Sequence, residues 1–491
     1  MESPIVAAET PDRAAHSRPS LVRGLSLLDS VLLLAGGIIG SSIFLTAKDI
    51  AGPLPHPALF FLVWILGALI SMCAAFAFAE LGSMFPDSGG QYVYLREAFG
   101  DLIAFLYGWM LFAVANGGTI AALSVASAAY LGGIFPAISQ EHLIGAFHVP
   151  WVSWVSGRPA FTLETITLTR AHLVGLVSIV IVTGINVVGL RRGAVLQNVA
   201  TWAKFVAMGA FVILGFLIGN GHWTNFVQHA GMGVTMGMSG HQLAAALGIG
   251  LIAVFWAYDG WVYITWVAGE VKDPRRNVPR AMVLGIVVVA VVYLAMNMTY
   301  VYAMPLTEVA KHETIVRSAA EALFSPEAAN WLSAVIALSC FGAMASCTLS
   351  GARVYFAMAQ DGVFFRRMAD VHPKWRTPAL SLIGQGIWAC ILTVSGRYDQ
   401  LYTYVIYGMV VSYTLTVIGL FVLRWKRPEL PRPYRCTGYP WLPAIYVLLG
   451  SWWAINTLVE RPMEALASTI IVLVGVPFYL FWKRTGRTKV S

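Results

Sequence analysis

Long apolar runs recur along the whole chain and are separated by short polar segments. Most runs are about 17 to 25 residues long, and about 20 apolar residues in a helix can cross the hydrocarbon core of a bilayer. Each run therefore predicts a membrane-spanning helix. The pattern predicts an all-α polytopic membrane protein with twelve spans, near residues 28–50, 58–80, 101–132, 172–190, 195–219, 242–268, 281–303, 328–357, 378–396, 400–423, 441–459 and 465–482.

The first run, residues 31–47, is interrupted near its middle. It carries no charge, but it contains three glycines and two adjacent serines: Gly36, Gly37, Gly40, Ser41 and Ser42. Backbone that leaves the helix inside a bilayer needs partners in protein, water or ligand, because lipid offers none. The segment therefore indicates either a binding site, where free amides face an anion, or a glycine seam for close helix packing.

The sixth run, residues 242–268, is also interrupted. It contains the sequence Phe255-Trp256-Ala257-Tyr258-Asp259-Gly260-Trp261. A carboxylate at membrane depth costs at least ~2.5 kcal/mol and normally faces a cavity or a partner. Asp259 either caps a half-helix that starts at Trp261, which the order Asp-Gly favours, or binds a ligand directly. Two interrupted spans, one in each half of the chain, are typical of secondary transporters built from inverted repeats.

Composition agrees with a membrane protein. The chain is 58% hydrophobic and 11% charged, with a mean hydropathy of +0.71, whereas soluble domains carry about 25% charged residues. With a cytoplasmic N-terminus, 24 of the 32 Lys and Arg residues fall in the tails and in loops after even-numbered spans, and seven fall outside. This bias predicts cytoplasmic N- and C-termini in the cell (inner) membrane. The basic runs indicate contacts with lipid headgroups and not nucleic-acid binding.

The segments outside the spans are less informative. Residues 1–22 lack the pattern of a signal peptide and predict a disordered cytoplasmic tail, before a single transmembrane domain over residues 23–485. The long segment 133–170 is partly apolar and predicts an external loop folded over the outer surface. Residues 305–326 predict one or two short external helices. None of the five cysteines falls in a predicted external loop, so no disulfide framework is indicated.

Site chemistry argues against a membrane enzyme. The ten histidines lie in tails, loops and span edges, without metal-ligand spacing inside a span, and no nucleophile–base pair is evident. We therefore expect no catalytic residue, metal or cofactor. Glu80 and Glu270 lie at cytoplasmic span ends, which favours a structural or gating contact over substrate binding, and Arg353 on span 8 either snorkels or pairs near the cytoplasmic surface. Asn116 in span 3 either lines the site or bonds a neighbouring helix.

Five motifs in order carry a resemblance to a known family. They are Gly40-Ser41-Ser42-Ile43-Phe44, Pro86 to Tyr92, Phe255 to Trp261 with Gly269 to Arg280, Leu338 to Gly342 with Arg353 and Gln360-Asp361-Gly362, and Leu423 to Pro433. With these motifs the chain resembles the amino acid–polyamine–organocation superfamily. Within that superfamily it resembles the bacterial L-type amino-acid transporter branch and is similar to serine/threonine exchangers. The resemblance covers residues 24–480.

The resemblance implies a fold of two inverted repeats of five helices, the LeuT-like fold, with broken helices 1 and 6. The repeats would cover about residues 26–220 and 240–425, followed by extra helices at about 440–483. A substrate carboxylate would meet the first break, at Gly40, Ser41, Ser42 and Ile43. The substrate ammonium would meet the second break, at Phe255, Trp256, Ala257, Asp259 and Gly260, with Trp256 as the closing aromatic and Asn116 nearby.

The resemblance also bears on coupling and partners. Lys204, a cation well inside predicted span 5, either snorkels to the headgroups or occupies the place of a sodium ion, with Ser339 or Ser346 on span 8 as hydrogen-bond acceptor. The resemblance implies a sodium-independent exchanger of neutral L-amino acids, with Ser, Thr and Ala favoured. A proton-coupled symporter, a cationic amino-acid permease and a non-transporting sensor stay open as alternatives. No cysteine lies between 133 and 170, so no disulfide-linked heavy-chain subunit is expected.

Overall fold

The structure is a computed structural model that describes residues 21–139, 142–155, 158–227, 237–312, 314–394, 398–460 and 462–487. The predicted tail, apart from its last two residues, lies outside this part of the chain. Eleven helical segments of the described chain are long and apolar enough to cross a membrane. A twelfth apolar helix, α17 (Ala379–Val394), stands at the predicted ninth span but is shorter. The twelve predicted spans thus correspond to eleven candidate spans and one shorter helix.

The helices follow the predicted runs closely. In the first half they are α1 (Leu27–Ile38), α2 (Ser42–Leu45), α3 (Ala47–Ala51), α4 (Pro57–Met84), α5 (Gln91–Phe99), α6 (Asp101–Met110), the π-helical turn η1 (Leu111–Ala115), α7 (Asn116–Ile134), the short η2 (Pro136–Ile138), α8 (Arg170–Val187), α9 (Leu190–Ile218) and η3 (Trp223–Phe226). In the second half they are α11 (Gly240–Ala257), α12 (Tyr263–Trp266), η4 (Ala268–Glu270), α13 (Pro274–Ala303), α14 (Leu306–Val309), α15 (Ile315–Leu323), α16 (Pro326–Gln360), η5 (Arg366–Ala369), α17, α18 (Tyr398–Lys426), α19 (Trp441–Glu460) and α20 (Pro462–Arg487). Both predicted interruptions are present, between α1 and α2 and between α11 and α12.

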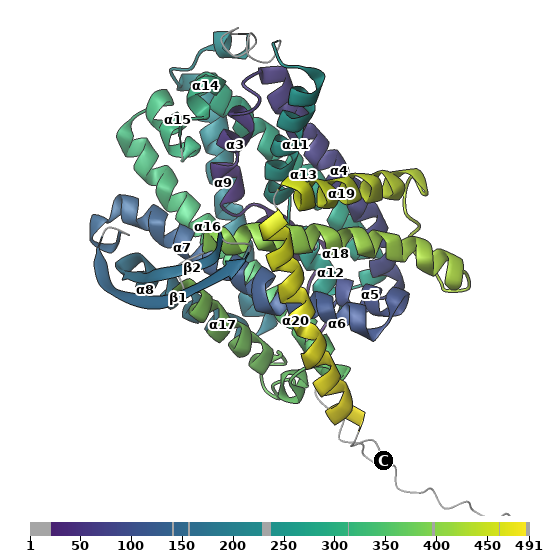
Figure 1. Cartoon of the computed structure of the whole chain (residues 1–491). Helices are drawn as coiled ribbons and strands as arrows, with labels where there is room; N and C mark the ends of the chain where they lie inside the picture. The colour runs from purple at the N-terminus through teal and green to yellow at the C-terminus, as the bar shows by residue number, and fades with distance from the viewer. Residues whose placement is uncertain are drawn as a thin grey trace, which may run out of the picture.

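The long segment between spans 3 and 4 corrects the all-α prediction. Its backbone forms an antiparallel hairpin of β1 (Leu143–Val155) and β2 (Arg158–Thr169), paired from Leu143↔Thr169 to Val155↔Arg158. β-Branched residues are frequent in both strands, mainly valine in β1 and threonine in β2, and such residues favour extended pairs. The hairpin lies beside α8, and β2 contacts both α8 and α17 (Figure 1).

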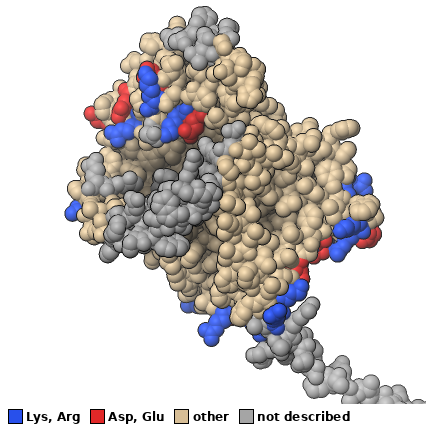
Figure 2. All heavy atoms as spheres, in the orientation of Figure 1, with Lys and Arg blue, Asp and Glu red and all other residues tan. Residues whose placement is uncertain are grey.

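A central group of helices packs around the first interruption. The long helix α16 packs against α7 and α9, α13 packs against α4, and α1 packs against α13, α9 and α16. The described charged side chains in Figure 2 gather over α14 and α15 and along the lower and right-hand edges, with an uncharged surface between them. This distribution fits a molecule whose waist lies in lipid. The end that carries Arg275, Arg276, Arg424 and Lys483 is called the basic end below.

Candidate functional site

The first interruption covers Ile39 to Ser41. The amide of Ile39 closes α1 by donating to the Ala35 carbonyl, and the Gly40 amide turns back to the Ile38 carbonyl at 2.8 Å. Helix α2 then starts at Ser42. The first amides of a helix have no acceptor within it, and those of Ser41, Ser42 and Ile43 donate to no acceptor among the described residues. The break therefore supplies donors of the kind that a carboxylate accepts.

The second interruption lies directly against the first. Helix α11 ends at Ala257, and α12 starts at Tyr263 after a turn in which Gly260 has φ +109°. A Cβ at Gly260 would lie 3.0 Å from the carbonyl carbon of Gly37 and 3.1 Å from the Ile38 nitrogen. Only glycine combines this backbone conformation with such a close approach. Two glycines thus let the two interrupted spans touch, main chain to main chain.

Tyr293 of α13 joins the two interruptions through its hydroxyl. The hydroxyl lies 2.8 Å from the Ala257 carbonyl, which ends α11, and 3.2 Å from the Ile38 carbonyl, which ends α1. The Ser42 hydroxyl lies 3.5 Å from the same oxygen and 3.4 Å from the Ala257 carbonyl. Two helix C-terminal ends, each partly negative, therefore meet at one buried point. Sequence analysis missed Tyr293, because a lone tyrosine in an apolar span carries no local signal.

Lys204 reaches the first interruption from α9. Its side chain is fully buried, so the snorkelling interpretation is wrong. The ammonium donates to the carbonyls of Ile39 at 2.5 Å, Gly36 at 3.1 Å and Ser339 at 3.4 Å. It therefore links α1, α9 and α16. Ser339 contacts the lysine through its carbonyl, while its hydroxyl donates to the carbonyls of Ile39 and Gly40.

Two predicted site residues bond elsewhere. The Ser346 hydroxyl donates to the Gly342 carbonyl within its own helix. The Asn116 amide donates to Gln385 Oε1 at 2.9 Å and to the Cys347 carbonyl at 3.4 Å, which ties α7 to α17 and α16. The structure therefore gives Asn116 the second of its two predicted roles, a hydrogen bond between helices. Among the described residues, Ser346 is not a hydrogen-bond partner of Lys204.

Asp259 and Trp256 face a separate pocket. This pocket, of about 430 Å³, is lined by Ser71, Phe255, Trp256, Asp259, Trp261, Ile406, Met409, Val410, Tyr413 and Tyr446, so none of its described lining comes from α1 or α2. The Tyr413 hydroxyl of α18 donates to Asp259 Oδ1 at 2.7 Å. Helix α12 starts at Tyr263, two residues later than predicted, and its N-cap residue Val262 makes no side-chain cap. The predicted capping of a half-helix at Trp261 is therefore wrong.

Comparisons with known proteins identify the family of the chain. The sequence profile described as "Amino acid permease" matches residues 25–480, which is most of the chain. The chain belongs to the amino acid permease family. It is similar to the b(0,+)-type amino acid transporter 1 of Mus musculus, at 28% identity over 480 residues that cover 96% of this chain and 91% of the relative. It is also similar to the serine/threonine exchanger SteT of Bacillus subtilis (strain 168), at 27% identity, covering 94% of this chain and 98% of the relative.

A third relative is the Asc-type amino acid transporter 1 of Homo sapiens, at 28% identity, with 96% of this chain and 84% of the relative covered. The permease is therefore a multi-pass membrane transporter of amino acids in the superfamily that the motifs indicated, in the group that contains these L-type transporters and exchangers, and not an enzyme. Its family implies the LeuT-like fold.

At its basic end the permease holds the exits of spans 6 and 8 together. Glu270 and Arg353 are fully buried and form a bidentate ion pair, with Nε to Oε2 at 2.9 Å and Nη2 to Oε1 at 3.1 Å. The chain just before α1 joins this contact, because the amides of Gly24 and Leu25 donate to the Glu270 carbonyl at 2.9 and 3.0 Å. The Lys272 amide donates back to the Leu25 carbonyl at 2.8 Å. Three spans are tied together here, so Glu270 makes a structural contact and Arg353 pairs with it instead of reaching the headgroups.

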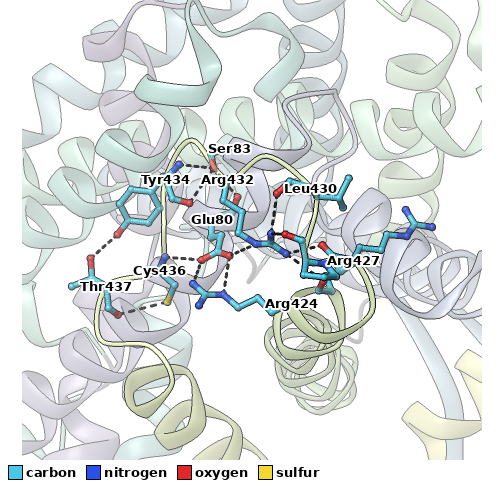
Figure 3. Close-up of polar contacts among 11 residues, drawn as sticks. Glu80, Ser83, Arg424, Arg427, Leu430, Arg432, Tyr434, Cys436 and Thr437 are labelled. Atoms are coloured by element: carbon cyan, nitrogen blue, oxygen red, sulfur yellow. Dashed lines mark hydrogen bonds and ion pairs between the residues drawn. The ribbon is translucent and has the colours of Figure 1, made fainter.

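Glu80 organises a second contact at the basic end. Its buried carboxylate accepts from Arg424 Nε at 3.0 Å and Nη2 at 2.6 Å, and from the Cys436 amide at 2.7 Å (Figure 3). Arg432 Nε adds an ion pair at 3.2 Å. Span 2 thus fixes the loop after span 10, which contains much of the fifth motif. Burial, together with the Glu80 charge, raises the pKa of the Cys436 thiol to about 12, so this thiol stays protonated.

Proposed function

We propose that this permease is a sodium-independent exchanger of small neutral L-amino acids, with Ser, Thr and Ala favoured. The juxtaposed interruptions support this most directly. Free amides at Ser41, Ser42 and Ile43 suit the substrate carboxylate. The carbonyl ends of α1 and α11 suit its ammonium. The two charges of one zwitterion are thereby matched by two ends of opposite polarity.

The proposal includes an inverted-repeat organisation. The interrupted spans open two successive sets of five spans, over about residues 26–220 and 240–425, and α19 and α20 supply the extra helices at about 440–483. The repeats would rock against each other around the interruptions. The basic end would face the cytoplasm with both termini, in the inner membrane, as the positive-inside bias favours. No disulfide-linked heavy-chain subunit is expected, since no cysteine lies between 133 and 170.

Lys204 supports independence from sodium. An ammonium that already contacts carbonyls of α1 and α16 fills the position in which a mobile cation would bridge these helices. A tethered charge cannot leave with the substrate, so the cycle needs no ion gradient. A lysine that keeps its proton throughout the cycle favours the exchanger, whereas one that releases its proton would carry a coupled proton.

Counterflow in proteoliposomes tests the proposal. Vesicles loaded with unlabelled L-serine should take up labelled L-serine, and empty vesicles should not, with the same rate in sodium and choline buffers and without a pH gradient. Accumulation driven by a proton gradient would instead establish symport, and sodium-driven accumulation would contradict the proposal. Binding without counterflow would indicate a sensor.

Asp259 favours one alternative, a permease for cationic amino acids. Its carboxylate lies in the pocket beside Trp256, where it can meet a second positive charge. Competition between labelled serine and unlabelled serine or arginine separates the two cases. With neutral substrates, Asp259→Asn should keep serine affinity and lower turnover, because an amide oxygen still accepts from Tyr413. Strong inhibition by arginine alone, abolished in Asp259→Asn, would establish the cationic permease.

A further inference from the structure

An open cleft of about 1370 Å³ lies at the basic end, away from both interruptions. Its walls are the start of α1 at Leu27, one face of α13, and the loop after α18 at Pro433 and Tyr434. Neither the transport site nor the two ion-pair clusters described above line it. The sequence predicts only that basic runs contact headgroups, and the cleft gives that contact a defined place.

Three arginines give the cleft its charge. Arg275, Arg276 and Arg280 line it, all three side chains are exposed, and no carboxylate is among the described lining residues. Within the described chain none of the three forms an ion pair with Asp or Glu. They stand on the first turns of α13, whose N-terminal end adds partial positive charge. The cleft therefore offers an uncompensated site for an anion.

The same face of α13 changes from basic to apolar along the helix. Residues four apart share a face, so Arg276 and Arg280 are followed on that face by Leu284, which is 48% exposed. Val287 and Val291 continue the exposed apolar surface, at 47% and 62%. An anion bound at the arginines would thus lie directly beside a surface that faces acyl chains. A free inorganic anion, which has no acyl chain, would make no favourable contact with this apolar surface.

The third wall is held in place by Glu80. Pro433 and Tyr434 lie between Arg432 and Cys436, and both of those residues contact the Glu80 carboxylate (Figure 3). The Tyr434 amide also donates to the Ser83 hydroxyl at 3.2 Å. The cleft is therefore preformed, so a ligand does not have to order the loop.

We propose that this cleft binds one anionic phospholipid, with its phosphate at Arg275, Arg276 and Arg280 and an acyl chain along Leu284 and Val287. Each arginine near an anionic lipid strengthens binding about fivefold, so loss of three should weaken it on the order of a hundredfold. The lipid would touch span 1, span 7 and the loop after span 10 at once. It would thereby bridge elements that Glu80 and Glu270 hold from the inside.

Native mass spectrometry of the full-length permease in detergent tests the site. Phosphatidylglycerol and phosphatidylcholine with the same acyl chains are titrated against the parent protein and the triple variant Arg275→Gln, Arg276→Gln, Arg280→Gln. A matched control, Arg191→Gln, Arg192→Gln, Lys426→Gln, removes three exposed cations outside the cleft. Arg280→Gln alone serves if the triple variant does not purify as a single species.

We expect one phosphatidylglycerol to bind the parent and the control with equal affinity, and the cleft variant to bind it on the order of a hundredfold more weakly, close to phosphatidylcholine. Equal binding of the two lipids by the parent would overturn the proposal, as would equal loss in the control. Displacement of phosphatidylglycerol by millimolar inorganic phosphate would assign the arginines to a free anion and also overturn it.

Discussion

At the scale of one residue, the contact between the two interruptions depends on Gly260. Gly260→Ala would place a Cβ 3.0 Å from the Gly37 backbone at a φ of +109°. Backbone strain of this kind costs roughly 1–3 kcal/mol, and the neighbouring atoms are main chain that cannot rotate away. We expect a lower unfolding temperature in detergent and exchange slowed at least about tenfold. Gly209→Ala is the control, since a Cβ at Gly209, inside α9, meets nothing within 4 Å; there the change should be neutral or stabilising.

Tyr293 allows a second test at this scale, because α13 supplies its own control. Tyr293→Phe removes one donor from the Ala257 and Ile38 carbonyls, and because each carbonyl keeps another donor, the loss should cost about 0.5–1.5 kcal/mol. Tyr300 is equally buried, but its hydroxyl has no partner among the described residues, so Tyr300→Phe should not destabilise. Thermal unfolding of both variants measures the difference. Equal effects of the two substitutions would show that the bridge contributes nothing.

At the scale of elements, the Glu270–Arg353 pair joins the exit of span 6 to α16. Removing one partner leaves the other buried and uncompensated, which costs about 3–5 kcal/mol. Glu270→Gln and Arg353→Gln should therefore each lower the free energy of unfolding by more than the loss of a surface ion pair does. The double variant should be less damaging than the sum, by about 0.5–3 kcal/mol. Unfolding in denaturant gives the four values, and strict additivity would mean that the contact is not an energetic unit.

The interruptions and the positions of the spans could be predicted from the sequence. Both interruptions were predictable because glycine, serine and aspartate inside an apolar run conflict with an unbroken helix. The positions of the runs follow from length and apolarity alone, and α17 differs only by being short. A structural or gating contact of Glu80 and Glu270 was also expected, since charge at a span end is ordinarily solvated or paired.

The partners themselves depend on tertiary packing. Asp259 meets Tyr413 across 154 residues, and Tyr293 reaches Ile38 across 255, so no local pattern identifies either contact. Asn116 had two equally reasonable roles, and its hydrogen bonds to α16 and α17 correspond to the contact between helices. The segment over residues 133–170 was predicted as an external loop folded over the outer surface, and the pairing of two parts of it into a hairpin is a contact that its apolar residues alone do not indicate.

At the scale of the whole molecule, the contacts divide into two groups with different consequences. The Glu270 and Glu80 contacts tie spans 1, 2, 6, 8 and 10 together at the basic end. The Lys204 and Tyr293 contacts lie deeper and hold the interruptions themselves. If the repeats rock against each other as proposed, we expect the Glu270 contacts of the first group to separate once per turnover. The contacts of Lys204 and Tyr293 would keep the two interruptions together during this movement.

The contacts of Lys204 matter both for the fold and for the proposed exchange. Lys204→Met keeps most of the side-chain volume but removes the donor to the carbonyls of Gly36, Ile39 and Ser339. Hydrogen bonds to a charged group contribute about 1.5–3 kcal/mol each, so α1 should lose its fixed position against α16. We expect counterflow of labelled serine to fall at least about tenfold at equal reconstituted protein. The same substitution at exposed Lys426 should leave the rate unchanged, which separates loss of this contact from loss of charge. Counterflow at the parental rate in Lys204→Met would contradict the role of the ammonium. Counterflow restored only by sodium would show that the place of the lysine ammonium, between α1 and α16, still accepts a mobile cation.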